Sequence, residues 1–228
     1  MSKNLASAKF QSMMRTTSPA AQDYLKALHT IEWEAGAPGP VSTTAVADRL
    51  GVSAASATNM LKKLDSMGLV VQVPYRGTEL TDAGRKVALE VVRHHRLLET
   101  YLAEALGVPW DEVHAEAEVL EHVLSERLED RIAALLGNPE WDPHGHPIPG
   151  KDGSMPPASR RTLWDGGDGE RLAVERVSDD DPEVLRYLAE DVEEQDMLAF
   201  ADDWEQFQDV VYALRSRGYE PFDGPDDE

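Results

Sequence analysis

The stretch Thr43-Thr-Ala-Val-Ala-Asp-Arg-Leu-Gly-Val-Ser-Ala-Ala-Ser-Ala-Thr-Asn-Met-Leu-Lys-Lys63 decides the fold of the first part of the chain. Residues 43–50 have the length and composition of a short helix, and Gly51 is suited to end it. Ser53 then has the side chain of a helix N-cap, which predicts a longer helix over residues 54–67. A short helix, a glycine turn and a capped second helix are typical of a helix-turn-helix.

The flanking sequence extends this motif on both sides. A helix is predicted over residues 18–34, because it begins with a serine followed by a proline, a common helix start. Two β-type runs, 69–73 and 78–80, are separated by a turn that contains proline and glycine, which predicts a hairpin. A hairpin directly after the second helix would make a winged helix, with Arg76 at the tip of the wing.

Residues of the predicted motif are suited to contact DNA. Small and polar side chains in the first half of the second helix would let it enter the major groove, where Ser56 or Asn59 could hydrogen-bond base edges. Basic side chains could bind phosphates, which position a protein on DNA. An ordinary surface helix with a capping serine is the alternative, since this motif gives many false positives. The candidate DNA-binding residues are Thr43, Thr44, Ser53, Ala55, Ser56, Asn59, Lys62, Lys63 and Arg76.

Histidine and glutamate recur at helical spacing further along the chain. A long helix is predicted from Asp82 to about Leu106, and a second helical pattern covers 111–122. Residues four apart share one side of a helix, and two such helices side by side could form a divalent-metal site. A single pair would be read as solvated side chains, but three linked pairs favour a metal site. The pairs are His95 with Glu99, His114 with Glu118 and Glu118 with His122, and Glu121 is adjacent to the last.

Composition limits the remaining interpretations. The chain of 228 residues contains no cysteine, which excludes disulfides and thiolate ligands. It has no apolar run of membrane-spanning length and no signal-peptide pattern, so we expect a cytoplasmic protein without a membrane partner. The net charge of −21 is uneven, because residues 1–100 contain 12 Lys and Arg and only 9 Asp and Glu. A DNA-facing part therefore remains possible there, with the acidic half turned away.

The sequence divides into five parts. We expect a mainly α protein with a winged-helix domain, a helical metal-binding domain and a Pro/Gly-rich linker in which His144 and His146 are structural or incidental. Within the acidic end, a strand is predicted at 172–177 and helices at 182–189 and 200–217. The parts are a flexible start (1–17), the DNA-binding domain (18–81), the helical metal-binding domain (82–137), the linker (138–170) and an acidic region (171–228).

These features in this order resemble the diphtheria toxin repressor family of metal-dependent regulators. The resemblance covers about residues 18–150 and includes His-Arg-Leu-Leu-Glu (95–99), His-Ala-Glu-Ala-Glu-Val-Leu-Glu-His (114–122) and Gly-His-Pro-Ile-Pro-Gly (145–150). It implies a winged-helix domain followed by a helical dimerisation domain. It also implies a homodimer that binds double-stranded operator DNA when metal is bound and represses metal-uptake genes.

The resemblance also implies two metal sites per subunit. Iron-responsive members carry Met and Cys where this chain has Asp23 and Glu118, whereas manganese-responsive members carry Asp and Glu. Oxygen donors suit Mn²⁺, so manganese is the expected effector and Fe²⁺ the alternative. Lys26 stands where the manganese branch has a glutamate, which departs from its paired-metal geometry. The implied ligands are His95, Glu99 and His114 for one site, and Asp23, Glu118, Glu121 and His122 for the other.

The resemblance weakens beyond residue 150. Many iron-responsive members continue into an SH3-like β domain, and residues 171–189 are similar to its opening strand and helix. After Glu190 the expected glycine-rich strands are missing, so we predict a degenerate or divergent SH3-like region. Asp179, Asp180 and Glu183 are carboxylates that could add a metal ligand.

Two other functions fit parts of the pattern. A carboxylate–histidine centre on helices could be a metalloenzyme that activates water or oxygen. The helix-turn-helix argues against an enzyme, as does the lack of a second constellation with a nucleophile and base. A metal-independent winged-helix regulator that binds an organic ligand is the other alternative.

Overall fold

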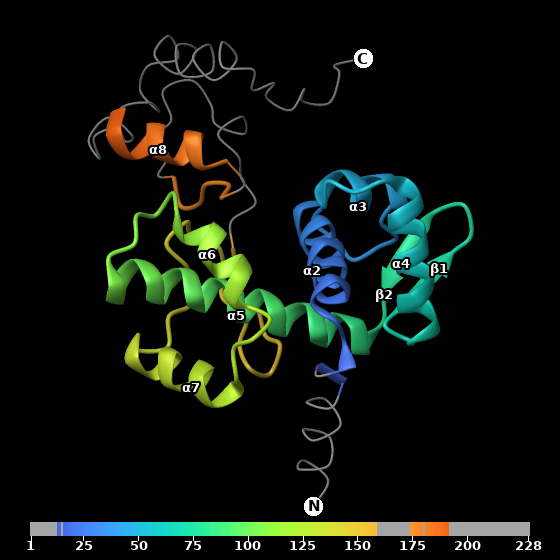
Figure 1. The fold of residues 1–228 in the computed structure, drawn as a ribbon, viewed down its shortest axis with the longest axis horizontal. Helices are drawn as coiled ribbons and strands as arrows, with labels where there is room; N and C mark the ends of the chain where they lie inside the picture. Colours follow the sequence, from blue (N-terminus) through green and yellow to red (C-terminus); the bar gives the residue numbers. More distant parts are fainter. Residues whose placement is uncertain (1–12, 15, 159–173, 180, 192–228) are drawn as a thin grey trace, which may run out of the picture.

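One long helix, α5 (Asp82–Leu106), joins the two halves of the molecule (Figure 1). It begins where predicted, because the Thr81 side chain accepts a hydrogen bond from the backbone nitrogen of Gly84. It ends at Gly107, whose left-handed backbone (φ 66°) suits glycine. The computed structural model describes residues 13–14, 16–158, 174–179 and 181–191.

The first half is a winged helix-turn-helix, as predicted. Ser53 caps α4 by accepting a hydrogen bond from the backbone nitrogen of Ser56. The wing is an antiparallel hairpin in which Val70 pairs with Leu80, and an isolated bridge joins Val41 to Thr78. The elements are α2 (Pro19–Glu34), α3 (Thr43–Arg49), α4 (Ala54–Ser66), β1 (Val70–Val73) and β2 (Gly77–Leu80).

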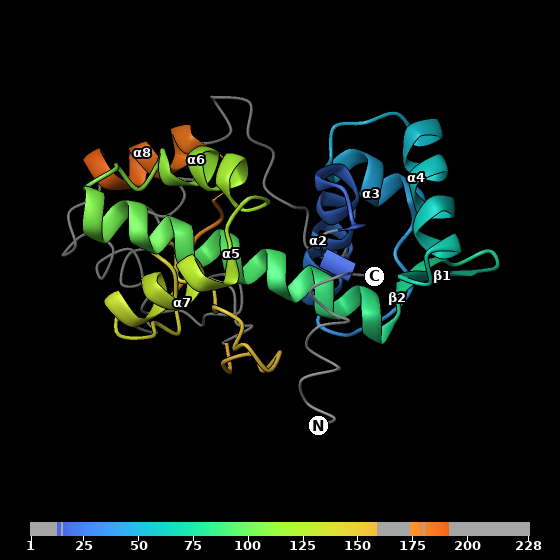
Figure 2. The same cartoon turned by 60° about the horizontal axis from the view of Figure 1, so that its bottom comes forward.

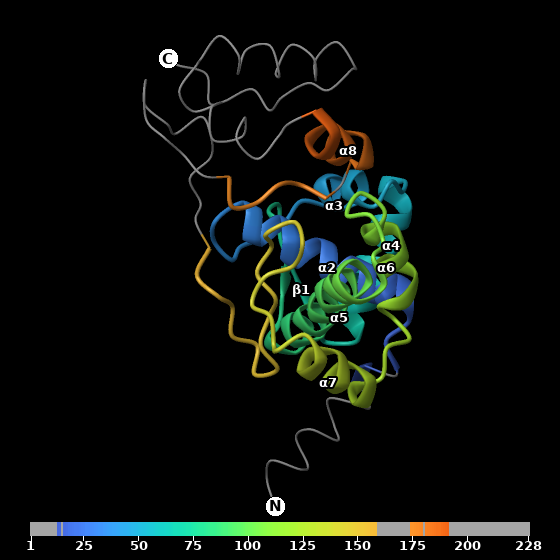
Figure 3. The same ribbon diagram turned by 90° about the vertical axis from the view of Figure 1, so that its left-hand side faces the viewer.

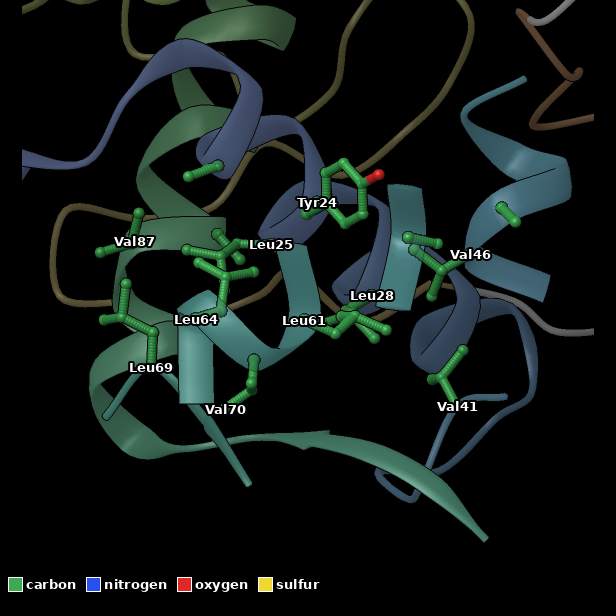
Figure 4. Packing of buried hydrophobic residues seen from close by; sticks show 14 residues of the cluster. Tyr24, Leu25, Leu28, Val41, Val46, Leu61, Leu64, Leu69, Val70 and Val87 are labelled. Atoms are coloured by element: carbon green, nitrogen blue, oxygen red, sulfur yellow. The ribbon is translucent and has the colours of Figure 1, made fainter. Parts of the chain in front are cut away.

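A compact apolar core holds these elements together (Figure 4). Leu25 and Leu28 of α2 pack with Leu61 and Leu64 of α4, and all four side chains are fully buried. Each buried leucine stabilises the fold by roughly 1.5–3 kcal/mol. The recognition helix α4 is therefore fixed to α2 by direct packing.

The second half is built on the distal part of α5. It contains α6 (Val113–Leu120), α7 (Glu126–Leu135) and α8 (Pro182–Asp191). Figures 2 and 3 show α6 and α7 on opposite sides of α5. The pattern predicted a helix as far as His122, but α6 ends at Leu120, so Glu121 and His122 lie in the turn that follows.

Residues 138–150 differ from the predicted linker. Ile148 is buried in the second core beside Leu97 and Leu98. Two arginines of α5 fasten the stretch, since Arg93 and Arg96 donate hydrogen bonds to the carbonyl oxygens of Pro149 and Pro147. These contacts come from a distant helix, so local composition did not reveal them.

The carboxyl-terminal predictions have mixed outcomes. The helix predicted at 182–189 is present as α8. The described part of the strand predicted at 172–177 is irregular backbone. The helix predicted at 200–217 and most of the divergent acidic region lie outside the described residues.

None of the helices in the described part of the chain has the length and apolar character needed to span a membrane.

The histidine His29 of α2 makes stability depend on pH. Its side chain is buried, and burial together with Arg96 and Arg85 lowers its pKa to about 4. Because its unfolded pKa is about 6.5, only the unfolded chain gains this proton as the pH falls from there toward 4, and stability is lost. Urea unfolding measures this: when the pH falls from 7 to 5, the free energy of unfolding of the wild type should decrease by about 2 kcal/mol more than that of His29→Gln. Equal losses in the two proteins would contradict this.

Candidate metal centre

Three segments bring the predicted metal ligands together. Helix α2 contributes Asp23, and α5 contributes His95 and Glu99 one turn apart. Helix α6 and the turn after it contribute the remaining four residues, which are His114, Glu118, Glu121 and His122. Four of these residues, Asp23, His95, His114 and Glu118, border an open cleft of about 540 Å³ between the two halves of the molecule.

The first group of ligands, the His114 cluster, consists of His95, Glu99, His114 and Asp179. Oε1 of Glu99 lies 2.9 Å from Nε2 of His95 and 3.2 Å from Nδ1 of His114. Oδ2 of Asp179 lies 3.2 Å from the same Nδ1. Potential ligand atoms from α5, α6 and the segment before α8 therefore converge.

The electrostatics of the His114 cluster favour positive charge. Burial alone would lower the pKa of His114, but hydrogen bonds to Asp179 and Glu99 raise it to about 10. Burial would raise the pKa of Glu99, yet His95 and His114 hold it well below its usual range. The carboxylates therefore stay ionised and attract a cation.

The second group, the Asp23 cluster, consists of Asp23, Glu121 and His122. Nε2 of His122 lies 2.8 Å from Oδ1 of Asp23 and 3.5 Å from Oε1 of Glu121. Nδ1 of the same ring lies 2.8 Å from Oε1 of Gln22 and donates a hydrogen bond to it, which orients the ring. Asp23 thus reaches across from the DNA-binding half to the other half.

Lys26 places an ammonium group between these clusters. Its Nζ lies 2.8 Å from carboxylate oxygens of both Glu118 and Glu121, and 3.1 Å from Nδ1 of His95. Burial would lower the pKa of Lys26, but the two glutamates raise it. The same glutamates and His95 form a third potential set of ligand atoms, so the lysine occupies a position where a cation would be favoured.

The stretch predicted as a linker also borders the His114 cluster. His144 is fully buried, with its Nδ1 3.9 Å from Oε1 of Glu99. Nδ1 of His146 lies 4.0 Å from Oδ2 of Asp179. The sequence pattern did not indicate that these two histidines, expected to be structural or incidental, lie beside the cluster.

The donor set of these residues fits a divalent metal ion. Oε2 of Glu99, Oε1 of Glu121 and Nδ1 of His144 are buried and have no hydrogen-bond partner among the described residues. Such groups cost free energy when left unpaired. The donors are carboxylate oxygens and imidazole nitrogens, the combination that binds Mn²⁺ and Fe²⁺.

The candidate DNA-binding residues lie on the surface of the other half. On α4, Ser53, Ala55, Ser56, Asn59, Lys62 and Lys63 are all exposed. Arg76 is exposed in the hairpin turn, Thr44 is exposed at the start of α3, and Thr43 is half-buried there. The geometry therefore leaves the predicted reading helix and wing free to approach DNA.

Sequence reasoning missed some residues of the site. The sequence did not distinguish Asp179 from two other candidate carboxylates. Its position depends on how residues 174–179 fold back onto the protein through tertiary contacts. The backbone nitrogen of Val177 donates to the carbonyl oxygen of His144, and Arg176 lies over the ring of Trp33. Gln22 was also missed, because its contact with His122 joins residues 100 positions apart in the chain.

Family models and relatives identify the class of protein. Residues 16–78 match the model described as iron dependent repressor, N-terminal DNA binding domain. Residues 81–150 match the model described as iron dependent repressor, metal binding and dimerisation domain. The diphtheria toxin repressor of Corynebacterium jeikeium is 31% identical over 173 residues, which cover 74% of this chain and 71% of that protein. The chain therefore belongs to the iron-dependent repressor family of metal-dependent transcriptional repressors, which are not enzymes.

Other relatives and solved structures agree with this assignment. The iron-dependent repressor IdeR of Mycobacterium tuberculosis is 39% identical over 127 residues, or 56% of this chain. The chain spans about half the length of the IdeR proteins it matches, since the aligned part is 54% of theirs. A manganese-dependent transcriptional repressor in complex with manganese is 51% identical, with a TM-score of 0.68 over 74% of this chain and 77% of that one. The manganese regulator SloR is 32% identical, with a TM-score of 0.64 over 75% and 78% of the two chains.

Proposed function

We propose that this chain is a manganese-activated transcriptional repressor that acts in the cytoplasm as a homodimer on operator DNA of metal-uptake genes. The observation that carries the proposal is the 2.8 Å contact between Asp23 and His122. Asp23 lies on α2, which packs against the recognition helix, whereas His122 belongs to the metal-binding half. Ligand residues thus connect sensing to DNA reading.

Two metal sites per subunit are proposed. The first uses His95, Glu99 and His114, with Asp179 as an additional ligand. The second uses Asp23, Glu118, Glu121 and His122. Mn²⁺ is the proposed effector, because the donors are hard oxygens and imidazoles without sulfur, and Fe²⁺ is the alternative. The names of similar proteins include both manganese- and iron-dependent repressors.

The proposed mechanism follows from the structural elements that carry the ligand residues. Asp23, Glu121 and His122 would hold a divalent ion, which would supply positive charge that offsets the repulsion between the two carboxylates. Those side chains then hold α2 against the turn after α6, and α2 holds α4 through Leu25 and Leu28. A protein held in this arrangement binds metal and DNA in the same conformation, so each ligand strengthens the binding of the other.

DNA contacts are proposed for α3, α4 and the wing. Ser53, Ala55, Ser56 and Asn59 would face the major groove, while Thr43, Thr44, Lys62, Lys63 and Arg76 would contact the phosphate backbone or the groove edge. The basic residues supply affinity that falls with salt, and the α4 residues supply sequence preference.

A dimer surface is proposed on the metal-binding half. Several large apolar side chains are exposed along α6, the turn after it and α7. Val119 and Val123 are 71% and 76% exposed, respectively. Large apolar side chains left exposed on neighbouring segments of the chain are typical of interaction sites. The other members of the surface are Leu120, Leu128 and Leu135.

Replacing Glu121 tests the proposed function. A DNA duplex is first selected from a random library with manganese-loaded protein, and its binding is then titrated against Mn²⁺. Glu121→Gln should require on the order of 100-fold more Mn²⁺ for half-maximal binding, because a buried carboxylate ligand is lost. Glu116→Gln, on the exposed part of α6, should behave like the wild type. Equal, metal-independent DNA binding by all three proteins would instead favour a metal-independent regulator.

A further inference from the structure

A separate cluster of ligand-type side chains lies on the α7 side of α5. Glu90 and His94 are one turn apart on α5, and Glu126 and Glu129 are three residues apart on α7. One potential ligand atom from each lies within 4.8 Å of those from the other three. Since α7 and α6 lie on opposite sides of α5 (Figure 3), this α5–α7 cluster is distinct from the Asp23 and His114 clusters.

His94 is oriented as a metal-binding histidine would be. Its side chain is buried, and Nδ1 lies 3.1 Å from the backbone carbonyl oxygen of Glu121, to which it donates a hydrogen bond. Nε2 therefore faces the carboxylates, 3.6 Å from Oε1 of Glu90 and 3.8 Å from Oε2 of Glu129. It has no hydrogen-bond partner among the described residues. Metal-bound histidines commonly donate their other ring nitrogen to a carbonyl in this way.

The carboxylates of the cluster lack full compensation. Glu129 is fully buried, and its Oε2 has no hydrogen-bond partner among the described residues. Burial and the neighbouring carboxylates raise the pKa of Glu90 to about 7, despite the opposing effect of His94. Arg93 binds only the other oxygen of Glu129, with its Nε 2.5 Å from Oε1. One oxygen is thereby oriented, and the other lies near both Nε2 of His94 and Nζ of Lys151.

Lys151 is the competing cation at this cluster. Its Nζ lies 3.3 Å from Oε2 of Glu129 and 3.5 Å from Oε2 of Glu126, and also contacts Asp130. The lysine side chain is 41% exposed, and it can move into solvent at little cost. Arg93, by contrast, is mostly buried and stays in place.

We propose that Glu90, His94, Glu126 and Glu129 bind a further divalent transition-metal ion between α5 and α7. Three carboxylates and one imidazole suit Mn²⁺ or Fe²⁺, and pairs of ligands at helical spacing on adjacent helices are known to build such centres. An ion there would fasten α7 to α5. Through Nδ1 of His94 it would also fix the backbone of Glu121, whose carboxylate belongs to the Asp23 cluster.

Manganese location and stoichiometry in the full chain test this proposal. Crystals of the wild type soaked in MnCl₂ should show an anomalous peak between His94 and Glu129, and crystals of Glu126→Gln should lack it. By equilibrium dialysis, Glu126→Gln should bind one Mn²⁺ fewer per chain than the wild type. Lys151→Met should bind that ion roughly tenfold tighter, because a competing positive charge is removed.

A matched control distinguishes the loss of a metal ligand from the loss of one negative charge elsewhere on the protein. Glu104→Gln, at an exposed position of α5, should bind as many ions as the wild type. Wild-type crystals with anomalous peaks at the Asp23 and His114 clusters alone would overturn the proposal, whether or not the variants fold. A peak at the α5–α7 cluster without peaks at the other two would support it and would instead contradict the proposed function.

Discussion

Replacing Lys26 by methionine is expected to destabilise the protein strongly in chelator and to make it more responsive to manganese. The ammonium is mostly buried between Glu118 and Glu121, and Glu121 is fully buried. Its removal leaves the buried Glu121 carboxylate with its contacts to His95 and His122 but without the lysine, which should cost about 3 kcal/mol. Urea unfolding in EDTA should show this loss, and Mn²⁺ should restore more stability to Lys26→Met than to the wild type.

A charge-conserving substitution is the control for this experiment. Lys26→Arg keeps a positive group beside the two glutamates and should lose less stability, with a manganese response like that of the wild type. If Lys26→Met in EDTA were as stable as the wild type, the lysine would not be acting as a built-in cation.

Gly84→Ala is expected to disrupt the junction between the wing and α5. An added Cβ at Gly84 would lie 1.8 Å from the backbone carbonyl oxygen of Leu69, which precedes β1. A backbone atom cannot move aside as a flexible side chain does, so the cost should reach or exceed the ~3 kcal/mol upper range for overpacking. Thermal unfolding of the variant should show a correspondingly lower midpoint.

The same helix supplies a control for that substitution. Lys86→Ala changes an exposed residue two positions further along α5 and should leave the unfolding midpoint within a degree or two of the wild type. A Gly84→Ala protein as stable as Lys86→Ala would contradict the close approach of α5 to Leu69.

The winged helix could be predicted because its signals are local. Ser53 and Thr81 each accept a hydrogen bond from a backbone nitrogen three residues later, as the N-cap pattern predicts. Ser18 stands at the predicted start of α2, but its side chain makes no capping hydrogen bond, and Pro19 supplies the start signal there. Helix boundaries were therefore accurate to within about two residues, and the largest differences include both ends of α6.

The surroundings of the metal centre could be predicted only in part. Helical spacing indicated the ligand pairs on α5 and near α6, because that periodicity is written in the sequence. The position of Asp179 depends on how residues 174–179 cross His144 and Trp33, which no local pattern encodes. The burial of Asp142 and His144 likewise depends on distant residues, Arg96 among them. His94 and Glu90 were passed over because their partners come from α7.

Helix α2 has one face toward the apolar core and another toward the ligands, since Leu25 and Leu28 are fully buried while Asp23 and Lys26 meet the turn after α6. In the proposed mechanism, α2 therefore carries candidate metal ligands on one face and the side chains that hold α4 on another. If these residues bind the ion as proposed, exchanging Asp23 or Lys26 would change the preferred metal while the packing of α2 on α4 stays intact. Related proteins could then differ in the metal they bind and still recognise the same DNA sequence.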